Sequence, residues 1–214
     1  MPKMIILPEA HPEVLLQLAE IARTAYKNAS FRNFGNEEYE DKCSLVGKKL
    51  FDLATDILSD EAVVIDRADV SKVYFESRKN NATLQLYDKY LKGKDIVWLY
   101  DDFPDIDLLT DRARRGVKDK FYYMLQEDAE KHTVKKLVEN PPEEGTIGIL
   151  KYGRKHIEKS DQTGDVPIGN IPKMLRDEGF EVEIMPSKDY DKEIDDHLRE
   201  IGLDVDGIRL FPMI

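Results

Sequence analysis

Cysteine is almost absent from this sequence, because Cys43 is the only one among 214 residues. A single cysteine excludes an intramolecular disulfide. Cys43 lies in an apolar stripe at helical spacing, which predicts a buried, reduced thiol and not a catalytic nucleophile.

Long apolar runs, internal repeats and low-complexity segments are also missing. The apolar run before Glu9 is too short for a signal sequence, and no later run reaches the length of a membrane span. A net charge of −11 without a dense basic run disfavours nucleic acid and membrane surfaces as partners. We therefore expect a cytoplasmic protein with no nucleic-acid and no membrane partner.

What the sequence does contain is enough apolar surface for a core. Its 41% hydrophobic and 35% charged residues are typical of a folded globular protein. The length favours one compact domain over residues 1–214.

The first part of the chain predicts one strand followed by two long helices. Residues 5–7 are typical of a buried strand, and apolar residues from Val14 to Ala25 then recur at helical spacing, with Pro12 suited to the first turn. Apolar positions between Tyr39 and Ile57 alternate steps of four and three, which predicts a second helix.

Further apolar segments predict a series of strands. They are EAVVID (61–66), DIVWLYDD (95–102), TIGILKYG (146–153), FEVEIMP (180–186) and GIRLF (207–211). The segment 67–93 has a mostly helical pattern, and helices are also expected within 105–139, 168–178 and 188–201. This alternation predicts an α/β fold with a mainly parallel or mixed central sheet flanked by helices, and a helical elaboration after strand one.

Polar groups follow four of these predicted strands. Because ligands bind beyond the carboxyl ends of the strands in open α/β sheets, these groups are the candidates for a site. They are Glu9 and His11, Asp66 and Asp69, Asp101 and Asp102, and Tyr152, Arg154 and His156.

Histidine has the greatest weight among these groups, because a neutral imidazole accepts a proton near neutral pH. His11 and His156 follow strands, whereas His132 and His197 lie in charged helical sequence typical of a solvated face. The alternative for His11 and His156 is a structural role, in which each caps a helix or binds a backbone carbonyl. The alternative for Glu9 is a favourable interaction with the positive end of the helix dipole.

The acidic pair Asp101 and Asp102 allows two interpretations. Carboxylates can bind a divalent cation, but adjacent residues on an extended chain point to opposite faces and are often solvated turn residues. The glycines of GTIGILKYG do not follow a strand and open a helix, so they do not indicate a phosphate-binding loop.

Two short motifs resemble a known family. PEAH at 8–11 is similar to the G-E-x-H signature of the erythromycin esterase, ChaN and TraB/Tiki superfamily, and YGRKH at 152–156 is similar to its second motif, G-x-x-H. The segment IGNIPKMLRDEGFEVEIMP also resembles the continuation of that family. The sequence departs from the pattern at Pro8, where glycine is expected.

The resemblance implies an α/β core whose histidines and glutamate face each other across a cleft. By the resemblance, Glu9 and His11 take the places of the first motif, and Gly153 and His156 those of the second. An arginine that some members place in the cleft has three candidates here: Arg112, Arg114 and Arg115.

The resulting hypothesis is an esterase-like hydrolase of a small-molecule or peptide substrate. Glu9, His11 and His156 are its catalytic candidates, and Tyr152, Gly153, Arg154, Asp101 and Asp102 its substrate-binding candidates; the polar loop 157–167 would serve as a lid. Two alternatives stay open, a non-catalytic ligand-binding or regulatory domain and a divalent-metal-dependent hydrolase. No cofactor and no oligomeric state follow from the sequence.

Overall fold

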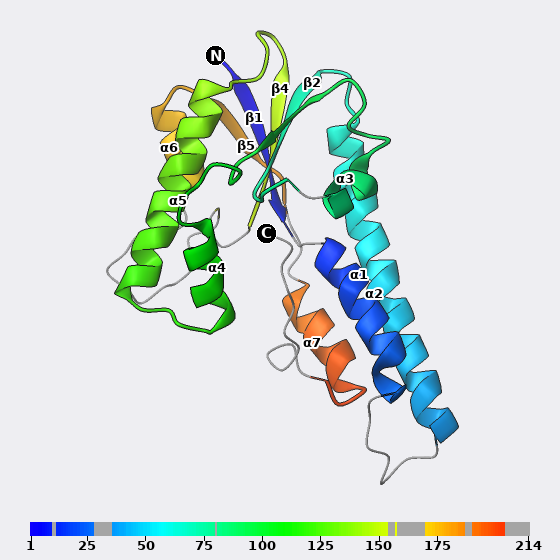
Figure 1. Ribbon diagram of the computed structural model, residues 1–214. Coiled ribbons are helices and arrows are strands. Elements are labelled where there is room, and N and C mark those ends of the chain that lie inside the picture. Colours follow the sequence, from blue (N-terminus) through cyan, green and yellow to red (C-terminus); the bar gives the residue numbers. More distant parts are fainter. Residues whose placement is uncertain are drawn as a thin grey trace. The chain divides into compact units, whose positions relative to one another are not determined.

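The chain adopts an α/β fold, which confirms the predicted fold class (Figure 1). The computed structural model describes residues 1–9, 12–27, 36–79, 81–153, 157, 170–186 and 190–203. The predicted strand 207–211, and the lid loop 157–167 apart from Ile157, lie outside these residues. The chain divides into two compact units.

Unit 1 comprises Met1–Glu9, Val63–Ser187 and the last two residues. It contains a sheet of five strands: β1 (Lys3–Glu9), β2 (Val70–Phe75), β3 (Asp95–Trp98), β4 (Ile147–Gly153) and β5 (Glu181–Ile184). The described strands lie in the order β3-β2-β4-β1-β5, and every pair is parallel. All their carboxyl ends therefore meet at one edge of the sheet.

One face of this sheet packs on the helices α4 (Ile106–Arg114), α5 (Lys120–Glu139) and α6 (Ile171–Asp177). Alternate strand residues such as Ile6, Tyr74 and Leu150 form a core there with Leu137 and Leu175. The short helix α3 (Asn81–Tyr87) supplies Tyr87 to the opposite face, where its ring lies 5.9 Å from that of Phe75. Both faces are thus apolar, as expected for a parallel sheet.

Gly148 lies in the centre of this packing. A Cβ atom at Gly148 would lie 3.0 Å from the Tyr74 ring and 3.1 Å from the Met4 side chain. Because Gly148 has no side chain, Tyr74 and Met4 can pack directly on the backbone of the central strand β4 at this position.

Unit 2 comprises Ala10–Ala62 and Lys188–Pro212. It is helical in its described part, with α1 (Pro12–Thr24), the 3-10 turn η1 (Ala25–Lys27), most of α2 (Asn36–Ile65), and α7 (Asp191–Arg199). The apolar seams predicted for the two long helices form one core, in which Cys43 is a fully buried free thiol. The two helices expected after strand one are confirmed.

Helix α1 approaches α2 closely at Gly47. A Cβ atom there would lie 2.8 Å from the backbone oxygen of Ala19 and 2.3 Å from the side chain of Arg23. Only a residue without a side chain permits this spacing between the two backbones.

The prediction of a strand at EAVVID is wrong, because these residues form the last turns of α2 and the turn after it. Ala62 and Ile65 are buried and Val63 is 75% exposed, which is helical spacing rather than strand alternation. The true second strand, β2, lies within 67–93, a segment whose pattern predicts mostly helix. Apolar runs this short suit a buried strand and a buried helix turn equally well.

The other predicted strands within the described residues are confirmed, but their bounds differ: β1 extends beyond the predicted residues 5–7, and the later strands are shorter than predicted. DIVWLYDD is a strand only over β3, which is an edge strand and only partly buried, and its last four residues form turns. No helix in the described part of the chain is long and apolar enough to cross a membrane.

Candidate functional site at the carboxyl edge of the sheet

The two family-like motifs leave the sheet from neighbouring strands. β1 pairs in parallel with β4, and the last pair of their register is Glu9 with Gly153. His11 follows Glu9 by two residues and His156 follows Gly153 by three. His11, Arg154 and His156 lie outside the described residues, as does the side chain of Glu9.

Pro8 fits into β1 without losing a hydrogen bond of the sheet. The backbone oxygen of Ile6 accepts a bond from Met185 on the β5 side, so the backbone groups of Pro8, two residues further, point to that side too. The pairing with β5 ends at Ile6 and Ile184, so within the described residues no strand pairs with β1 beside the missing N–H of Pro8. The departure from the family pattern therefore leaves the strand intact up to Glu9.

Glu76 is a further acidic residue at this edge, and it directly follows β2. One of its carboxylate oxygens accepts a short hydrogen bond from the backbone N–H of Gly153, and the other lies 3.4 Å from the Tyr100 hydroxyl. Glu76 thus holds the end of β4 where the second motif begins. Sequence reasoning missed it because β2 was not predicted.

Asp66 and Asp69 are not at this edge, contrary to the prediction. Asp66 follows the helix α2, and Asp69 precedes β2, where its backbone oxygen accepts a bond from the first residue of β4, Ile147. Asp69 also forms an exposed ion pair with Arg67, at 2.8 Å, which lowers the pKa of its carboxyl group. Both residues therefore lie before the amino end of β2, away from the carboxyl edge of the sheet.

Tyr152 is fully buried beneath this edge. Its hydroxyl lies 2.5 Å from that of Tyr100 and 3.1 Å from the Thr133 hydroxyl. Together with Glu76 these residues form what we call the tyrosine cluster: Glu76, Tyr100, Thr133 and Tyr152. Burial raises the pKa of both tyrosines well above the ordinary 10.0. Their hydroxyls therefore stay protonated and can donate hydrogen bonds at neutral pH.

Asp101 and Asp102 stabilise the turn after β3 in different ways. Asp101 accepts a hydrogen bond of 2.7 Å from the backbone N–H of Lys79. Asp102 pairs with Lys136 at 2.7 Å and with His132 at 3.2 Å, and the bond from Lys136 is the main reason why its pKa is lowered. No group of three or more metal-ligating side chains exists within the described residues.

His132 is not on a solvated face, contrary to the prediction. Its Nε2 lies 3.1 Å from the backbone oxygen of Leu99 as well as 3.2 Å from Asp102, and its ring packs 5.2 Å from that of Phe103. Through these contacts with Leu99 and Asp102, His132 connects α5 to the turn that follows β3. His197 lies between two charged side chains, Glu193 at 3.7 Å and Glu200 at 3.2 Å, and its side chain is only 19% exposed, as is that of His132.

One of the three candidate arginines links α4 to the start of α5: Arg112 forms a short ion pair with Asp119 and stacks over the Phe121 ring. Arg115 pairs with Asp111 at 3.0 Å, within the end of α4. The side chain of Arg114 lies outside the described residues.

Lys151 is the second polar group that the sequence did not single out. It precedes Tyr152 in β4, so its side chain points to the other face of the sheet, and it is fully buried. Its Nζ donates a 2.5 Å hydrogen bond to the Tyr87 hydroxyl and lies 4.3 Å from the centre of that ring. The signal in the sequence was a lone lysine between apolar residues of a central strand.

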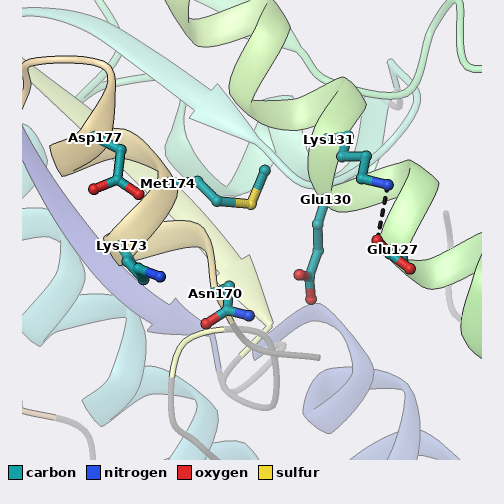
Figure 2. A pocket seen from close by; sticks show the side chains of 7 residues that line it. All are labelled: Glu127, Glu130, Lys131, Asn170, Lys173, Met174 and Asp177. Carbon is teal, nitrogen blue, oxygen red and sulfur yellow. Dashed lines mark ion pairs between the residues drawn. The ribbon is translucent and has the colours of Figure 1, made fainter. Parts of the chain in front are cut away.

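A small pocket lies between α5 and α6 (Figure 2). Its volume is about 130 Å³, and it is lined by Glu127, Glu130, Lys131, Asn170, Lys173, Met174 and Asp177. Lys131 pairs with Glu127 at 2.8 Å, and Met174 extends from α6 toward α5. At about 30 Å³ for each water molecule, the pocket has room for only a few waters or a very small ligand.

No family model, no curated protein and no solved structure matches this chain. The resemblance to the esterase-like superfamily therefore rests only on the two motifs and the segment IGNIPKMLRDEGFEVEIMP.

Proposed function

We propose that this protein is an esterase-like hydrolase whose catalytic groups gather where β1 and β4 end. The observation that supports this proposal is the parallel pairing of Glu9 with Gly153. Two motifs that are far apart in the sequence thereby begin on adjacent strands, about 4.8 Å apart, at the edge where α/β proteins bind ligands.

In this proposal His11 is the general base that takes a proton from the attacking water. Glu9 accepts a hydrogen bond from the other ring nitrogen of His11, which fixes its tautomer and raises its basicity. His156 stabilises the negative charge that develops on the substrate oxygen, or acts as a second acid or base. The water oxygen bonds to the carbonyl carbon, the bond between that carbon and the leaving group then breaks, and the proton held by His11 passes to the leaving group.

The surroundings support such a role for the end of β4. The carboxylate of Glu76 accepts a hydrogen bond from the Gly153 N–H. The same carboxylate contacts the Tyr100 hydroxyl, which is hydrogen-bonded to the buried Tyr152 hydroxyl. A strand end fixed by buried hydrogen bonds keeps the start of the YGRKH motif in place, as a preorganised site requires. Arg154, Gly153, Asp101 and Asp102 are the proposed substrate contacts; of Tyr152 only the backbone is available for this, since its side chain is buried.

The direct test compares His11→Ala, His156→Ala and Glu9→Gln with His197→Ala as a matched control. All four are assayed on a panel of ester, amide and phosphoester substrates. We expect the two histidine variants to lose about 100-fold or more in kcat/KM, the usual contribution of acid–base groups, and the His197 variant to stay within about two-fold. Activity that survives both His11→Ala and His156→Ala would refute the proposal.

Two outcomes would point to the alternatives. A folded wild-type chain that hydrolyses nothing in the panel, yet binds one of the compounds, would favour the non-catalytic ligand-binding domain. Activity that a chelator abolishes and zinc or manganese restores would favour the metal-dependent hydrolase.

A further inference from the structure

The corner between α4 and α5 exposes a group of apolar side chains. The two helices meet at the end of unit 1 that lies opposite the start of β1 (Figure 1). Four large apolar side chains of this corner are 37–48% exposed, and we call them the corner patch: Leu108, Val117, Phe121 and Met124. Exposed apolar residues that stand alone are normal, but a group of them indicates a surface that binds a partner.

The members of the corner patch lie around Arg112. Leu108 is one helical turn before Arg112, on the same side of α4. The Val117 N–H donates a 3.0 Å hydrogen bond to the backbone oxygen of Arg112, and the Arg112 guanidinium group lies 5.1 Å from the centre of the Phe121 ring. Met124 is three residues after Phe121, on the same side of α5. The apolar side chains therefore gather on one surface.

Basic residues border the corner patch. Residues 111–120 contain five basic and two acidic residues, a net charge of +3 in a chain whose net charge is −11. Both acidic residues are paired with arginines of the corner: Asp119 with Arg112, and Asp111 with Arg115. Lys118 and Lys120 are exposed, and neither forms an ion pair within the described part of the chain. The corner is therefore positively charged beside its apolar side chains.

Acidic residues near the corner oppose this charge only weakly. Asp107, at the start of α4, is paired with Arg78. The next acidic residues along α5, Glu127 and Asp128, lie about 10 Å along the axis from the start of that helix. This distance is about one Debye length at physiological salt, so their repulsion of an anionic surface at the corner is largely screened. The expectation of no membrane partner rests on the net charge of the whole chain, which averages over this corner.

We propose that this corner docks the protein on an anionic lipid surface. The corner patch enters the zone between headgroups and acyl chains, while Arg115, Lys118 and Lys120 contact the lipid phosphate groups. Peripheral membrane binding combines these two features, exposed apolar side chains and a basic border. The docking surface stands apart from the proposed hydrolase and does not depend on it.

The shape and composition of the corner favour a lipid surface over an acidic peptide or a nucleic acid. The side chains belong to a helix–helix connection at the end of unit 1, which suits a flat surface, whereas the apolar face of a peptide helix needs a groove (Figure 1). The bases of single-stranded nucleic acid stack on aromatic rings, and the corner patch offers one such ring, that of Phe121.

Sedimentation with lipid vesicles tests the proposal on the full chain. The vesicles contain phosphatidylcholine alone or with about 30% phosphatidylserine, and we expect at least about 10-fold stronger binding to the anionic vesicles. Raising the salt from about 0.1 M to about 0.5 M should weaken this binding, because salt screens the lysines and arginines. Equal binding to both kinds of vesicle would overturn the proposal, as would binding to single-stranded RNA or polyglutamate in place of the anionic vesicles.

The double variant Lys118→Glu, Lys120→Glu tests the basic border. It should lower the affinity for anionic vesicles about 10-fold or more, because each lysine near the surface contributes to the attraction. The double variant Lys89→Glu, Lys92→Glu is the matched control, since it makes the same charge change at two exposed lysines between α3 and β3. An equal loss in both double variants would show that only the net charge matters, and would refute docking through the corner.

The double variant Phe121→Ser, Met124→Ser tests the corner patch. Its affinity for anionic vesicles should fall about 10-fold, whereas Val138→Ser, which alters an exposed apolar residue near the other end of α5, should change it less than about two-fold. Urea unfolding, followed by the fluorescence of Trp98, the only tryptophan, checks that each variant is folded. An unchanged affinity of the folded double variant would refute a role for the corner patch.

A fluorescence measurement covers the case in which the serine variant does not fold. In Phe121→Trp, the fluorescence added to that of the buried Trp98 should shift to the blue and be quenched by brominated lipids in anionic vesicles. The control Val138→Trp should show neither change. Vesicle-bound Phe121→Trp that is not quenched would refute the insertion of the corner patch.

Discussion

Removal of the Tyr152 hydroxyl should destabilise unit 1 by about 2 kcal/mol. This hydroxyl lies 2.5 Å from that of Tyr100 and 3.1 Å from that of Thr133, and all three residues are buried. A buried hydrogen bond contributes about 0.5–1.5 kcal/mol net, and two are lost in Tyr152→Phe. The variant also leaves the Thr133 hydroxyl, 0% exposed, without this partner.

The assay is urea unfolding of Tyr152→Phe, Tyr100→Phe and the double variant, again followed by Trp98. Because the two tyrosines share one hydrogen bond, their effects should fall short of additivity by about 1 kcal/mol. Tyr123→Phe, which alters a partly exposed tyrosine of α5, should change the free energy of unfolding by less than about 0.5 kcal/mol.

A Tyr152→Phe variant as stable as the wild type would refute this reasoning. It would mean that the hydroxyl contributes no net stability, and that the cluster does not hold Glu76 against the end of β4. A matching loss in Tyr123→Phe would refute it equally, since the effect would then not be specific to the cluster.

Three further predictions concern the buried tyrosines and two glycines. Burial raises the pKa of Tyr74 and of both cluster tyrosines above 10.0. The contribution of these protonated tyrosines to stability is therefore complete below about pH 10 and is lost as the pH rises beyond it. Urea midpoints measured from about pH 8 to about pH 11.5 should fall only in the upper part of that range. Gly148→Ala should cost about 1–3 kcal/mol in thermal or urea unfolding, because the new methyl group would meet Tyr74 at 3.0 Å. Gly47→Ala should also lower the free energy of unfolding by about 1–3 kcal/mol, because the new methyl group would meet the Ala19 oxygen at 2.8 Å and push α2 away from α1. Faster hydrogen exchange in α1 and α2 would reveal the weaker packing of these two helices. Unchanged stability of Gly148→Ala or Gly47→Ala would show that the fold does not depend on the close packing at that glycine.

The fold class could be predicted from the sequence because most elements have a clear period. The apolar seams of α1 and α2 run over several turns, and the strand at 147–153 is bounded by turn residues and glycine. The failure at 61–75 has a physical cause. AVVI is too short to distinguish a strand from the end of a helix, and VSKVYF is interrupted by the polar Lys72.

The candidate site could be predicted only in part, for the same reason. The expectation that both motifs follow strands is confirmed for Glu9 and Gly153, which end β1 and β4. That these two strands are neighbours is a property of the strand order, which no local pattern encodes. Glu76 was missed because β2 was not predicted, so its contact with Gly153 could not be foreseen. Lys151 has a local signal, a lysine within an apolar strand, but its partner Tyr87 is distant in sequence.

The position of β1 in the sheet also has a consequence for synthesis on the ribosome. β1 is made before the other described strands of its sheet, but both of its neighbours, β4 and β5, lie after Glu139, beyond α5 in the sequence. Its apolar residues Met4 to Leu7, buried in the finished fold, therefore cannot pair until Ile147 and the residues after it have been made. A ribosome that stalls before Ile147 would hold a nascent chain with an unpaired apolar strand, a natural target for chaperones and proteases.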